Sequence, residues 1–130
     1  MTKAEDTVRR GYAAFIAGDM ELLGSLYTPD VVHRQPGHNQ TSGEYKGVDD
    51  VIAFYGRLFE LSGGTLQLEL KSLKTSGDSV VSVHGIKAQR DGKSLDAEER
   101  IEFTLEGEKI SRLDVTYLNE AVFDAFWGKA

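Results

Sequence analysis

The spacing of apolar residues changes near the middle of the chain. Before residue 62, apolar side chains recur every three or four positions, which is the spacing of an amphipathic helix. From Thr65 onward they alternate with polar side chains, as in a strand with one buried face. The pattern therefore predicts helices in the first half of the chain and a sheet in the second.

Three helices are predicted before the sheet begins. The first covers residues 5–17, and the second starts with Asp19 as its N-cap and is ended by Pro29. The third opens at Gly47 and is closed by residues 62–64. Residues that we expect these first two helices to bury are Val8, Tyr12, Phe15, Ile16, Leu22, Leu23, Leu26 and Tyr27.

A short strand over residues 31–35 separates the second helix from the third. It breaks at Pro36-Gly37 into a polar loop that extends to Lys46. A strand in this position commonly lines the space between a helix layer and a sheet, where small ligands bind. We therefore expect a pocket beside this strand.

Four strands and a short helix are predicted after residue 64. Glycine-containing turns separate the strands, so consecutive strands should pair as an antiparallel meander. Asn119 can cap the last helix, which closes one end of the core with Val122, Phe123, Phe126 and Trp127. The predicted strands begin at Thr65 and then cover residues 79–90, 94–105 and 109–118. Helices followed by such a sheet define an α+β fold.

The Asp91-Gly92 turn fixes the register of the two strands that it joins, because it is suited to a two-residue type I′ hairpin. This register places His84 directly opposite Glu99, among apolar residues on the inner face. It also places Lys87 opposite Asp96 on the outer face, which is a favourable pairing of opposite charges.

The same register turns Val81 and Val83 toward the outer face of the sheet. Two exposed valines on one strand predict that this face is covered. A homodimer formed through the outer sheet face would cover it.

The next hairpin is predicted to turn through the three residues 106–108. That turn would align the two strands so that Tyr117 lies near the His84–Glu99 pair. The predicted pairs are Leu113 with Ile101, Val115 with Glu99, and Tyr117 with Ala97.

The predicted pairing of His84 with Glu99 has chemical consequences. A carboxylate beside an imidazole in a dry site stabilises the imidazolium and orients the ring, which can produce a general base near neutral pH. The alternative is a buried pair whose hydrogen bonds contribute only to the specificity of the fold. The sequence leaves both interpretations open.

Composition excludes several classes of function. The net charge of -6 and the absence of clustered lysine and arginine argue against nucleic acid as a partner. No segment resembles a membrane span, a basic amphipathic helix or a signal peptide, so no membrane partner is expected and a cytoplasmic location is predicted. The 130 residues suit a single domain over residues 1–130.

No cofactor or metal is expected from the motifs. The chain has no cysteine, no glycine-rich phosphate loop and no dinucleotide fingerprint. His33, His38 and His84 lack the short spacings of a dedicated metal site.

Three segments of the chain resemble a known family. They are residues 8–19 (VRRGYAAFIAGD), 27–37 (YTPDVVHRQPG) and 42–55 (SGEYKGVDDVIAFY). Together with the order of elements, they are similar to the SnoaL-like branch of the nuclear transport factor 2 (NTF2-like) superfamily, which includes polyketide cyclases and has ketosteroid isomerases as relatives. The resemblance implies a cone in which a curved antiparallel sheet wraps around the N-terminal helices and encloses a pocket.

Of three catalytic positions in ketosteroid isomerase, the resemblance implies that this chain retains one and lacks two. Its buried acid, an oxyanion donor, corresponds to Glu99. Its general base falls on Gln35, or on Arg34 if the gap is moved by one residue, and neither side chain is a base. Its tyrosine on the first helix falls on Gly11, next to Tyr12. The classical isomerase mechanism is therefore not expected here.

If Gln35 points into the pocket, His33 does so as well, because alternate residues of a strand share a face. His33 is thus a second candidate base, with a hydrogen-bonded core residue as the alternative. Residues expected to contact a ligand are Gln35, Tyr117, Tyr12, Asn39 and Tyr55, although each of the last four could instead be core or satisfy a loop.

Two functions fit these expectations. The first is a cofactor-independent enzyme of isomerase, dehydratase or cyclase type, acting on a small apolar molecule such as a polyketide or terpenoid. In it, His84 backed by Glu99 moves a proton, and His33, Gln35 or Tyr117 stabilises the oxyanion. The second is a domain of the same fold that binds a small ligand or dimerises without catalysis.

Overall fold

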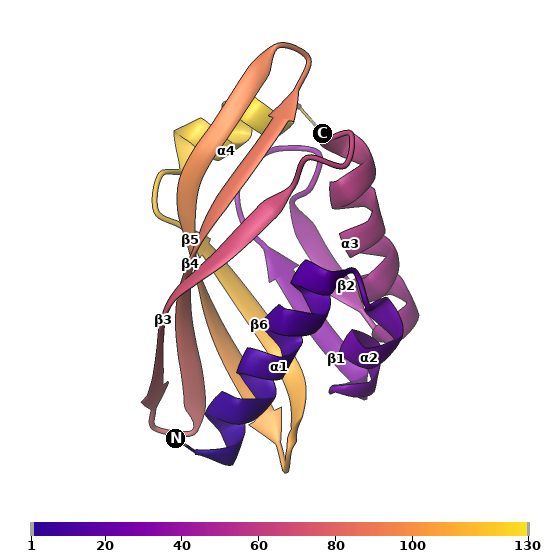
Figure 1. Ribbon diagram of the computed structural model, residues 1–130, viewed down its shortest axis with the longest axis vertical. Helices are drawn as coiled ribbons and strands as arrows, with labels where there is room; N and C mark the ends of the chain where they lie inside the picture. Colours follow the sequence, from indigo (N-terminus) through magenta and orange to yellow (C-terminus); the bar gives the residue numbers. More distant parts are fainter. Residues whose placement is uncertain (1, 130) are drawn as a thin grey trace.

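The computed structural model describes residues 2–129, which form four helices and six strands (Figure 1). The predicted order of elements is confirmed, with one additional strand, β2. The elements are α1 Lys3–Ala17, α2 Met20–Ser25, β1 Tyr27–Gln35, β2 Gly43–Lys46, α3 Val48–Leu61, β3 Gln67–Ser76, β4 Ser79–Arg90, β5 Lys93–Glu106, β6 Lys109–Tyr117 and α4 Glu120–Trp127.

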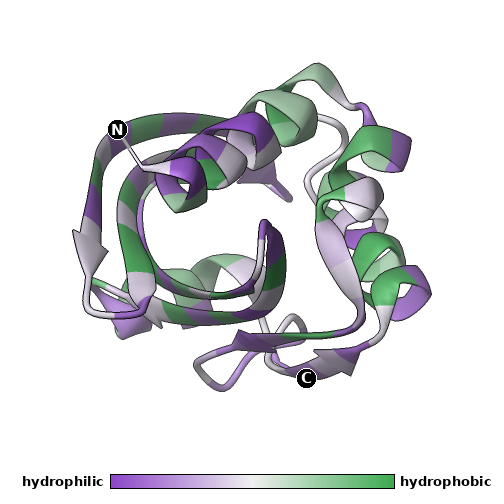
Figure 2. Cartoon of the chain, turned by 90° about the horizontal axis from the view of Figure 1, so that it is seen from below, coloured by the Kyte–Doolittle hydropathy of each residue, from purple (hydrophilic) through white to green (hydrophobic). Residues whose placement is uncertain are grey.

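All six strands belong to one sheet with the order β2-β1-β6-β5-β4-β3. The predicted antiparallel meander is confirmed for β3 to β6, whereas β1 pairs with β6 in parallel. The sheet curls around the interior, and α1 lies across its open side (Figure 2). This is the α+β cone that the family resemblance implied, with a mixed rather than wholly antiparallel sheet.

Small residues bring α1 close to the sheet. The helix begins at its cap Thr2, and its buried face includes Gly11 and Ala14. A Cβ atom on Gly11 would lie 3.9 Å from Ile110 of β6. Ile16 was predicted to be buried but is 58% exposed, because it lies on the edge of this face in the last turn. That prediction was wrong.

The second helix is shorter than predicted. It ends at Ser25, and the chain enters β1 at Tyr27, so Pro29 lies inside the strand and does not end the helix. Leu26 and Tyr27 are buried as expected, although not by the helix, while Leu22 is 39% exposed. The pairing of β1 with β6 is interrupted between Tyr27 and Val32, which gives proline a place without a ladder hydrogen bond.

The loop after β1 ends earlier than predicted because residues 43–46 form β2. This strand pairs antiparallel with β1, with Gln35 opposite Gly43 and His33 opposite Tyr45. The four residues of this strand, Gly-Glu-Tyr-Lys, show no pattern of alternating apolar side chains, so the sequence alone indicated only a loop.

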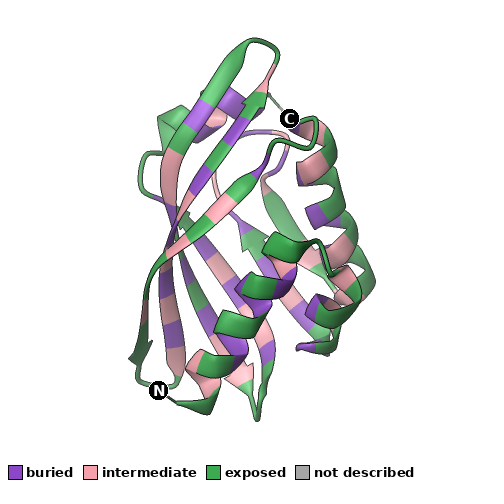
Figure 3. Cartoon of the chain, in the orientation of Figure 1, coloured by how far each residue is buried: buried purple, intermediate pink, exposed green. Residues whose placement is uncertain are grey.

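The predicted register of the β4–β5 hairpin is confirmed at every predicted pair, including His84 with Glu99 and Lys87 with Asp96. Asp91 and Gly92 both have positive φ, as a type I′ turn requires. Along β4, buried residues alternate with intermediate or exposed ones (Figure 3).

The predicted register of the β5–β6 hairpin was wrong by two residues. Tyr117 lies opposite Glu99 rather than opposite Ala97, and Leu113 lies opposite Phe103. The turn is tighter than predicted, with Glu106 opposite Lys109, and a β-bulge follows between Thr104 and Leu105. Because the error is an even number, every side chain keeps its predicted face.

The outer face of β4 carries the two valines noted in the sequence. Val81 and Val83 are partly buried there, opposite the exposed residues Glu102 and Arg100 of β5. The homodimer through this face stays a prediction, and sedimentation of the purified protein would test it.

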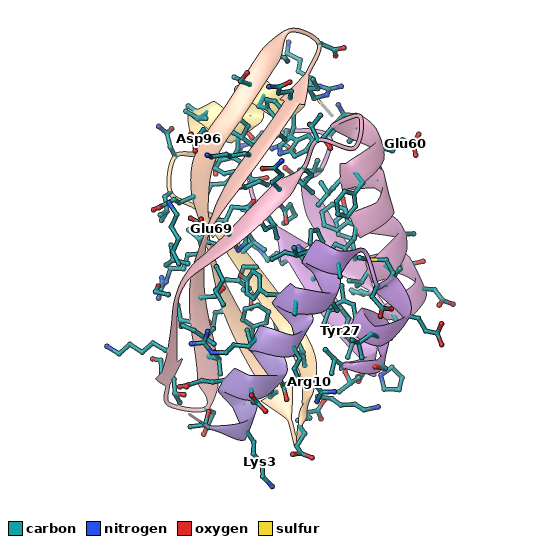
Figure 4. The ribbon with its side chains drawn as sticks, in the orientation of Figure 1. Lys3, Arg10, Tyr27, Glu60, Glu69 and Asp96 are labelled. Atoms are coloured by element: carbon teal, nitrogen blue, oxygen red, sulfur yellow. The ribbon has the colours of Figure 1, made fainter. Side chains whose placement is uncertain are left out.

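The last helix closes one end of the cone. Asn119 caps α4 by accepting a hydrogen bond from the backbone of Val122, as predicted. Phe123, Phe126 and Trp127 are buried, and α4 packs against β5. Apolar side chains fill much of the space between helices and sheet, whereas the labelled Lys3 and Glu60 extend outward (Figure 4). No helix within residues 2–129 is long and apolar enough to cross a bilayer.

Candidate active site

A cavity lies between α1, α3 and the inner face of the sheet. It offers about 70 Å³ in which the centre of a water molecule can move. This is several times the roughly 10–15 Å³ that a single water needs, so the cavity has room for a small ligand. The polar lining residues are Tyr12, Tyr27, His33, Gln35, Tyr55, His84 and Glu99. The remaining lining residues are apolar and include Phe15, Leu58, Leu66, Ile86, Ile101 and Trp127.

His84 and Glu99 form a buried pair on this wall. The Nε2 atom of His84 lies 2.7 Å from Oε1 of Glu99, and the two side chains are 2% and 8% exposed. Their position follows from the Asp91-Gly92 turn, which makes them direct neighbours across β4 and β5. The sequence therefore predicted this contact correctly.

Tyr12 of α1 contacts the other ring nitrogen of His84. Its hydroxyl lies 2.6 Å from Nδ1 of His84 and 2.7 Å from Oγ of Ser82, which is two residues earlier on β4. The two rings meet edge to face, with centroids 5.4 Å apart. Both ring nitrogens of His84 therefore have hydrogen-bond partners within the protein.

Gln35 connects Glu99 to β1. Its Nε2 atom lies 3.4 Å from Oε2 of Glu99 and 3.1 Å from the hydroxyl of Tyr117. Gln35 is 7% exposed, whereas Arg34 is exposed, so Gln35 is the residue that faces the pocket. The contact with Glu99 is long for a hydrogen bond, so it is the weakest connection in this part of the site.

His33 continues the network from Gln35 toward α3. Its Nε2 atom lies 2.8 Å from Oε1 of Gln35, and its Nδ1 atom lies 3.0 Å from the hydroxyl of Tyr55. The Tyr55 hydroxyl in turn lies 2.8 Å from that of Tyr27. A continuous series of hydrogen bonds therefore runs from Ser82 to Tyr27, through both histidines and Glu99.

The orientation of Gln35 gives these hydrogen bonds a direction. Its amide nitrogen faces Glu99, so its oxygen accepts from Nε2–H of His33. In a neutral His33, Nδ1 then accepts from the hydroxyl of Tyr55, and Tyr55 accepts from Tyr27. This assignment rests on the pattern of partners and on the neutral state of the ring.

Burial reinforces the neutral state of His33. Removal from water lowers the pKa of His33 from 6.5 to about 4, although Gln35 and Glu99 oppose the shift. Burial likewise raises the pKa values of Tyr12, Tyr27 and Tyr55, so these hydroxyls keep their protons. Near neutral pH, His33 is therefore a hydrogen-bonding group without charge.

The shifted pKa of His33 predicts a loss of stability in mild acid. Between the unfolded value of 6.5 and the folded value of about 4, the unfolded chain binds a proton that the folded protein does not. The free energy of unfolding should therefore fall as the pH drops through this range, by about 2 kcal/mol at pH 5 relative to pH 8. Urea denaturation at both pH values measures this effect.

A matched pair of variants isolates the contribution of His33. In His33→Gln this part of the pH dependence should disappear, whereas His38→Gln, at an exposed position, should retain it. Equal pH dependence in the wild type and in His33→Gln would contradict the neutral buried state.

Two of the predicted ligand contacts lie behind the cavity wall. Tyr117 receives hydrogen bonds from Gln35 and Asn39 and stacks on Phe123, with ring centroids 4.0 Å apart. Asn39 is 1% exposed, and its amide bonds Asp124 and Thr41. Neither residue is part of the lining, whereas Tyr12, Gln35 and Tyr55 are.

Sequence reasoning missed two members of the network. Tyr27 was assigned to the second helix. It is separated from Val31 and His33 by even numbers of residues, so a strand that began at Tyr27 would have turned all three side chains inward. Ser82 was placed on the inner face beside His84, but its hydroxyl gave no sign of a partner seventy residues earlier.

One exposed cluster has the composition of a metal site. His38, Glu120 and Asp124 bring one ligand atom each within 4.8 Å of one another. Oδ1 of Asp124 already accepts hydrogen bonds from the backbone of His38 and the side chain of Asn39. These contacts explain the cluster as a link between the loop and α4.

The family follows from comparison with known proteins. The family model described as SnoaL-like domain matches residues 8–113, so the chain belongs to the SnoaL-like family, with an NTF2-like fold. An uncharacterized protein of Mycobacterium tuberculosis is 37% identical over 123 residues, which cover 94% of each chain.

Solved structures agree with this assignment. Bal32a, from a soil-derived mobile gene cassette, is 33% identical with a TM-score of 0.93, covering 98% of this chain and 100% of the other. A candidate SnoaL-like polyketide cyclase from Jannaschia sp. CCS1 shares the fold at 20% identity and a TM-score of 0.79, covering 98% of this chain and 94% of the other.

Proposed function

We propose that this protein is a cofactor-independent acid/base enzyme that acts on a small, largely apolar molecule held in the cavity. The supporting observation is the His84–Glu99 pair, which is buried on the wall of an otherwise mainly apolar cavity. Isomerisation, dehydration and cyclisation all need such a proton-transfer group and a site that excludes water. The candidate polyketide cyclase from Jannaschia sp. CCS1, which shares this fold, is consistent with the proposal.

Glu99 is the group of the pair that contacts the substrate in this proposal. Both nitrogens of His84 are engaged, whereas Oε2 of Glu99 has only the 3.4 Å contact with Gln35. In this proposal His84 does not contact the substrate; it donates a hydrogen bond to Glu99 and stabilises the charge of that carboxylate. This assigns the first proton transfer to Glu99, where the sequence had suggested His84.

The proton-transfer step is simple in outline. An acidic C–H or O–H bond of the substrate breaks, its electron pair stays on the substrate, and the proton forms a new O–H bond at Oε2 of Glu99. Gln35, released from the neutralised carboxyl group, can then donate to the substrate oxyanion. Return of the proton to another atom gives isomerisation, and loss of a leaving group gives dehydration.

The proposal is tested by following deuterium. The purified protein is incubated in D₂O with a panel of cyclic ketones, phenols and enolisable diketones, together with any compound that copurifies with it. Mass spectrometry of each compound then reports deuterium on carbon. We expect protein-dependent incorporation for at least one small apolar compound. Loss of a C–H or O–H proton from such a compound gives an enolate or phenolate, and a deuteron from the exchanged carboxyl group of Glu99 can then form a C–D bond.

The alternative is a domain of the same fold that binds its ligand without turnover. A copurifying compound that binds in the cavity, but shows neither exchange nor conversion to a product, would support that alternative. The enzyme proposal would then fail even though the cavity is a ligand site.

A further inference from the structure

The polar side chains on the cavity wall use their hydrogen-bond donors on one another. Tyr27 donates to Tyr55, Tyr55 to His33, and His33 to Gln35. The two amide protons of Gln35 serve Glu99 and Tyr117. Every donor on this side of the network is therefore occupied before a ligand arrives.

The donors around His84 are occupied in the same way. Nε2–H of a neutral His84 donates to Glu99, and the hydroxyl of Tyr12 donates to Nδ1. If His84 is instead protonated, its Nδ1–H donates to Tyr12, and the Tyr12 hydroxyl donates to Ser82. In both protonation states the donors of the two lining residues at this end, Tyr12 and His84, are therefore used.

The hydrogen-bonding groups that remain available on the cavity wall are acceptors, chiefly the carboxylate oxygens of Glu99. A carboxylate offers about four lone-pair sites, and only His84 contacts Glu99 at a normal distance. The 3.4 Å contact between Oε2 and Gln35 is the place where a stronger donor can replace a weak one.

The rest of the lining argues against an anionic ligand. Within the described part of the chain, no lysine or arginine lines the cavity. The one basic group beside Glu99 is His84, whose two ring nitrogens are already engaged, so a second negative charge would have no further cation to offset it.

From this count of donors and acceptors, we infer that the ligand is an uncharged, largely apolar alcohol, phenol or enol. Its hydroxyl group donates a hydrogen bond to Oε2 of Glu99. The inference deepens the proposed function and rests on it for the location of the ligand. Ketones and carboxylates, which bring only acceptors, are the wrong complement for this wall. In the reaction, the hydroxyl proton is then the first to reach Glu99.

Binding of a matched set of compounds tests the inference without requiring turnover. Naphthol, methoxynaphthalene and naphthoate share one ring system and differ in carrying a donor, no donor or an anion. Isothermal titration calorimetry at neutral pH should show naphthol binding at least about tenfold more tightly than either of the others, since a hydrogen bond to a charged acceptor is worth that much or more.

Two variants separate Glu99 from other causes of the preference. Glu99→Gln turns an amide N–H toward the ligand, so the preference for naphthol over methoxynaphthalene should disappear or reverse. Trp127→Phe removes the indole N–H from the lining and keeps a ring, so the preference should persist even if all affinities fall.

The outcomes distinguish the inference from the proposed function. Methoxynaphthalene or naphthoate binding as tightly as naphthol to the wild type would overturn the inference, while deuterium exchange could still support an enzyme. An unchanged preference in Glu99→Gln would overturn it as well. If none of the three compounds binds, the inference fails, and the exchange experiment decides the function independently.

Discussion

Glu99→Gln is expected to fold like the wild-type protein and to lose at least about a hundredfold in the rate of deuterium incorporation. Glutamine keeps an oxygen that can accept from Nε2–H of His84, so the contact across β4 and β5 survives. It cannot accept a proton near neutral pH, and a positioned acid/base group typically contributes between a hundredfold and ten-thousandfold. The proposed function therefore predicts a large loss of rate with little loss of structure.

The neighbouring residue provides a matched control. Glu98 lies on the outer face, where its carboxylate is 2.8 Å from Nζ of Lys71. Glu98→Gln makes the same chemical change at a partly exposed ion pair and should alter neither exchange nor the urea midpoint by much. Exchange that survives in Glu99→Gln, measured on the same substrate and at the same pH, would remove Glu99 from the mechanism.

The contact between His84 and Glu99 could be predicted because one turn determines it. Asp91 and Gly92 adopt the positive φ values of a type I′ hairpin, and in such a turn the register follows from the residue numbers. The β5–β6 hairpin had no comparable signal. Its glycine allowed turns of two or three residues, and the bulge beside Leu105 depends on packing that is not visible locally.

The rest of the network depends on contacts between distant segments. The hydroxyl of Tyr12 reaches His84 only because small residues of α1 allow the helix to approach the sheet. The sequence showed the large apolar residues of that helix, and we therefore predicted that Ile16 belongs to its buried face, whereas Ile16 is exposed. Which face of a helix is buried depends on where its backbone comes closest to its neighbours. The positions of the large side chains alone are a poor guide to that face.

The comparison with ketosteroid isomerase also gains a physical meaning. The resemblance put that enzyme's general base on Gln35, or on Arg34 if the gap is moved by one residue. Of the two, Gln35 faces the cavity, with its amide nitrogen toward Glu99 and its oxygen toward His33. A carboxylate at this position would face Glu99 across 3.4 Å and require one of the two to bind a proton. Glutamine instead joins both sides of the site without adding charge, which leaves Glu99 as the acidic group of the lining.

Gly37→Ala is expected to destabilise the protein by about 2–4 kcal/mol, the largest effect on stability among the changes considered. Gly37 follows β1 with φ of 87°, a region that costs other residues about 1 kcal/mol. A Cβ atom there would also lie 2.6 Å from Oδ1 of Asp124 and 2.8 Å from the ring of Tyr117. Crowding of this kind typically costs a further 1–3 kcal/mol, roughly.

Gly92→Ala separates the two contributions, because Gly92 has a similar φ of 75° but no atom within 4 Å of its would-be Cβ. It should therefore cost only about 1 kcal/mol. Neither neighbour of Gly37 can move freely, since Asp124 binds the backbone of His38 and the Tyr117 ring stacks on Phe123 at 4.0 Å. Urea denaturation of both variants gives the comparison. Equal losses in the free energy of unfolding would mean that the backbone after β1 shifts to make room for the added methyl group. The back of the cavity wall, where Tyr117 supports Gln35, would then be less rigid than these contacts indicate.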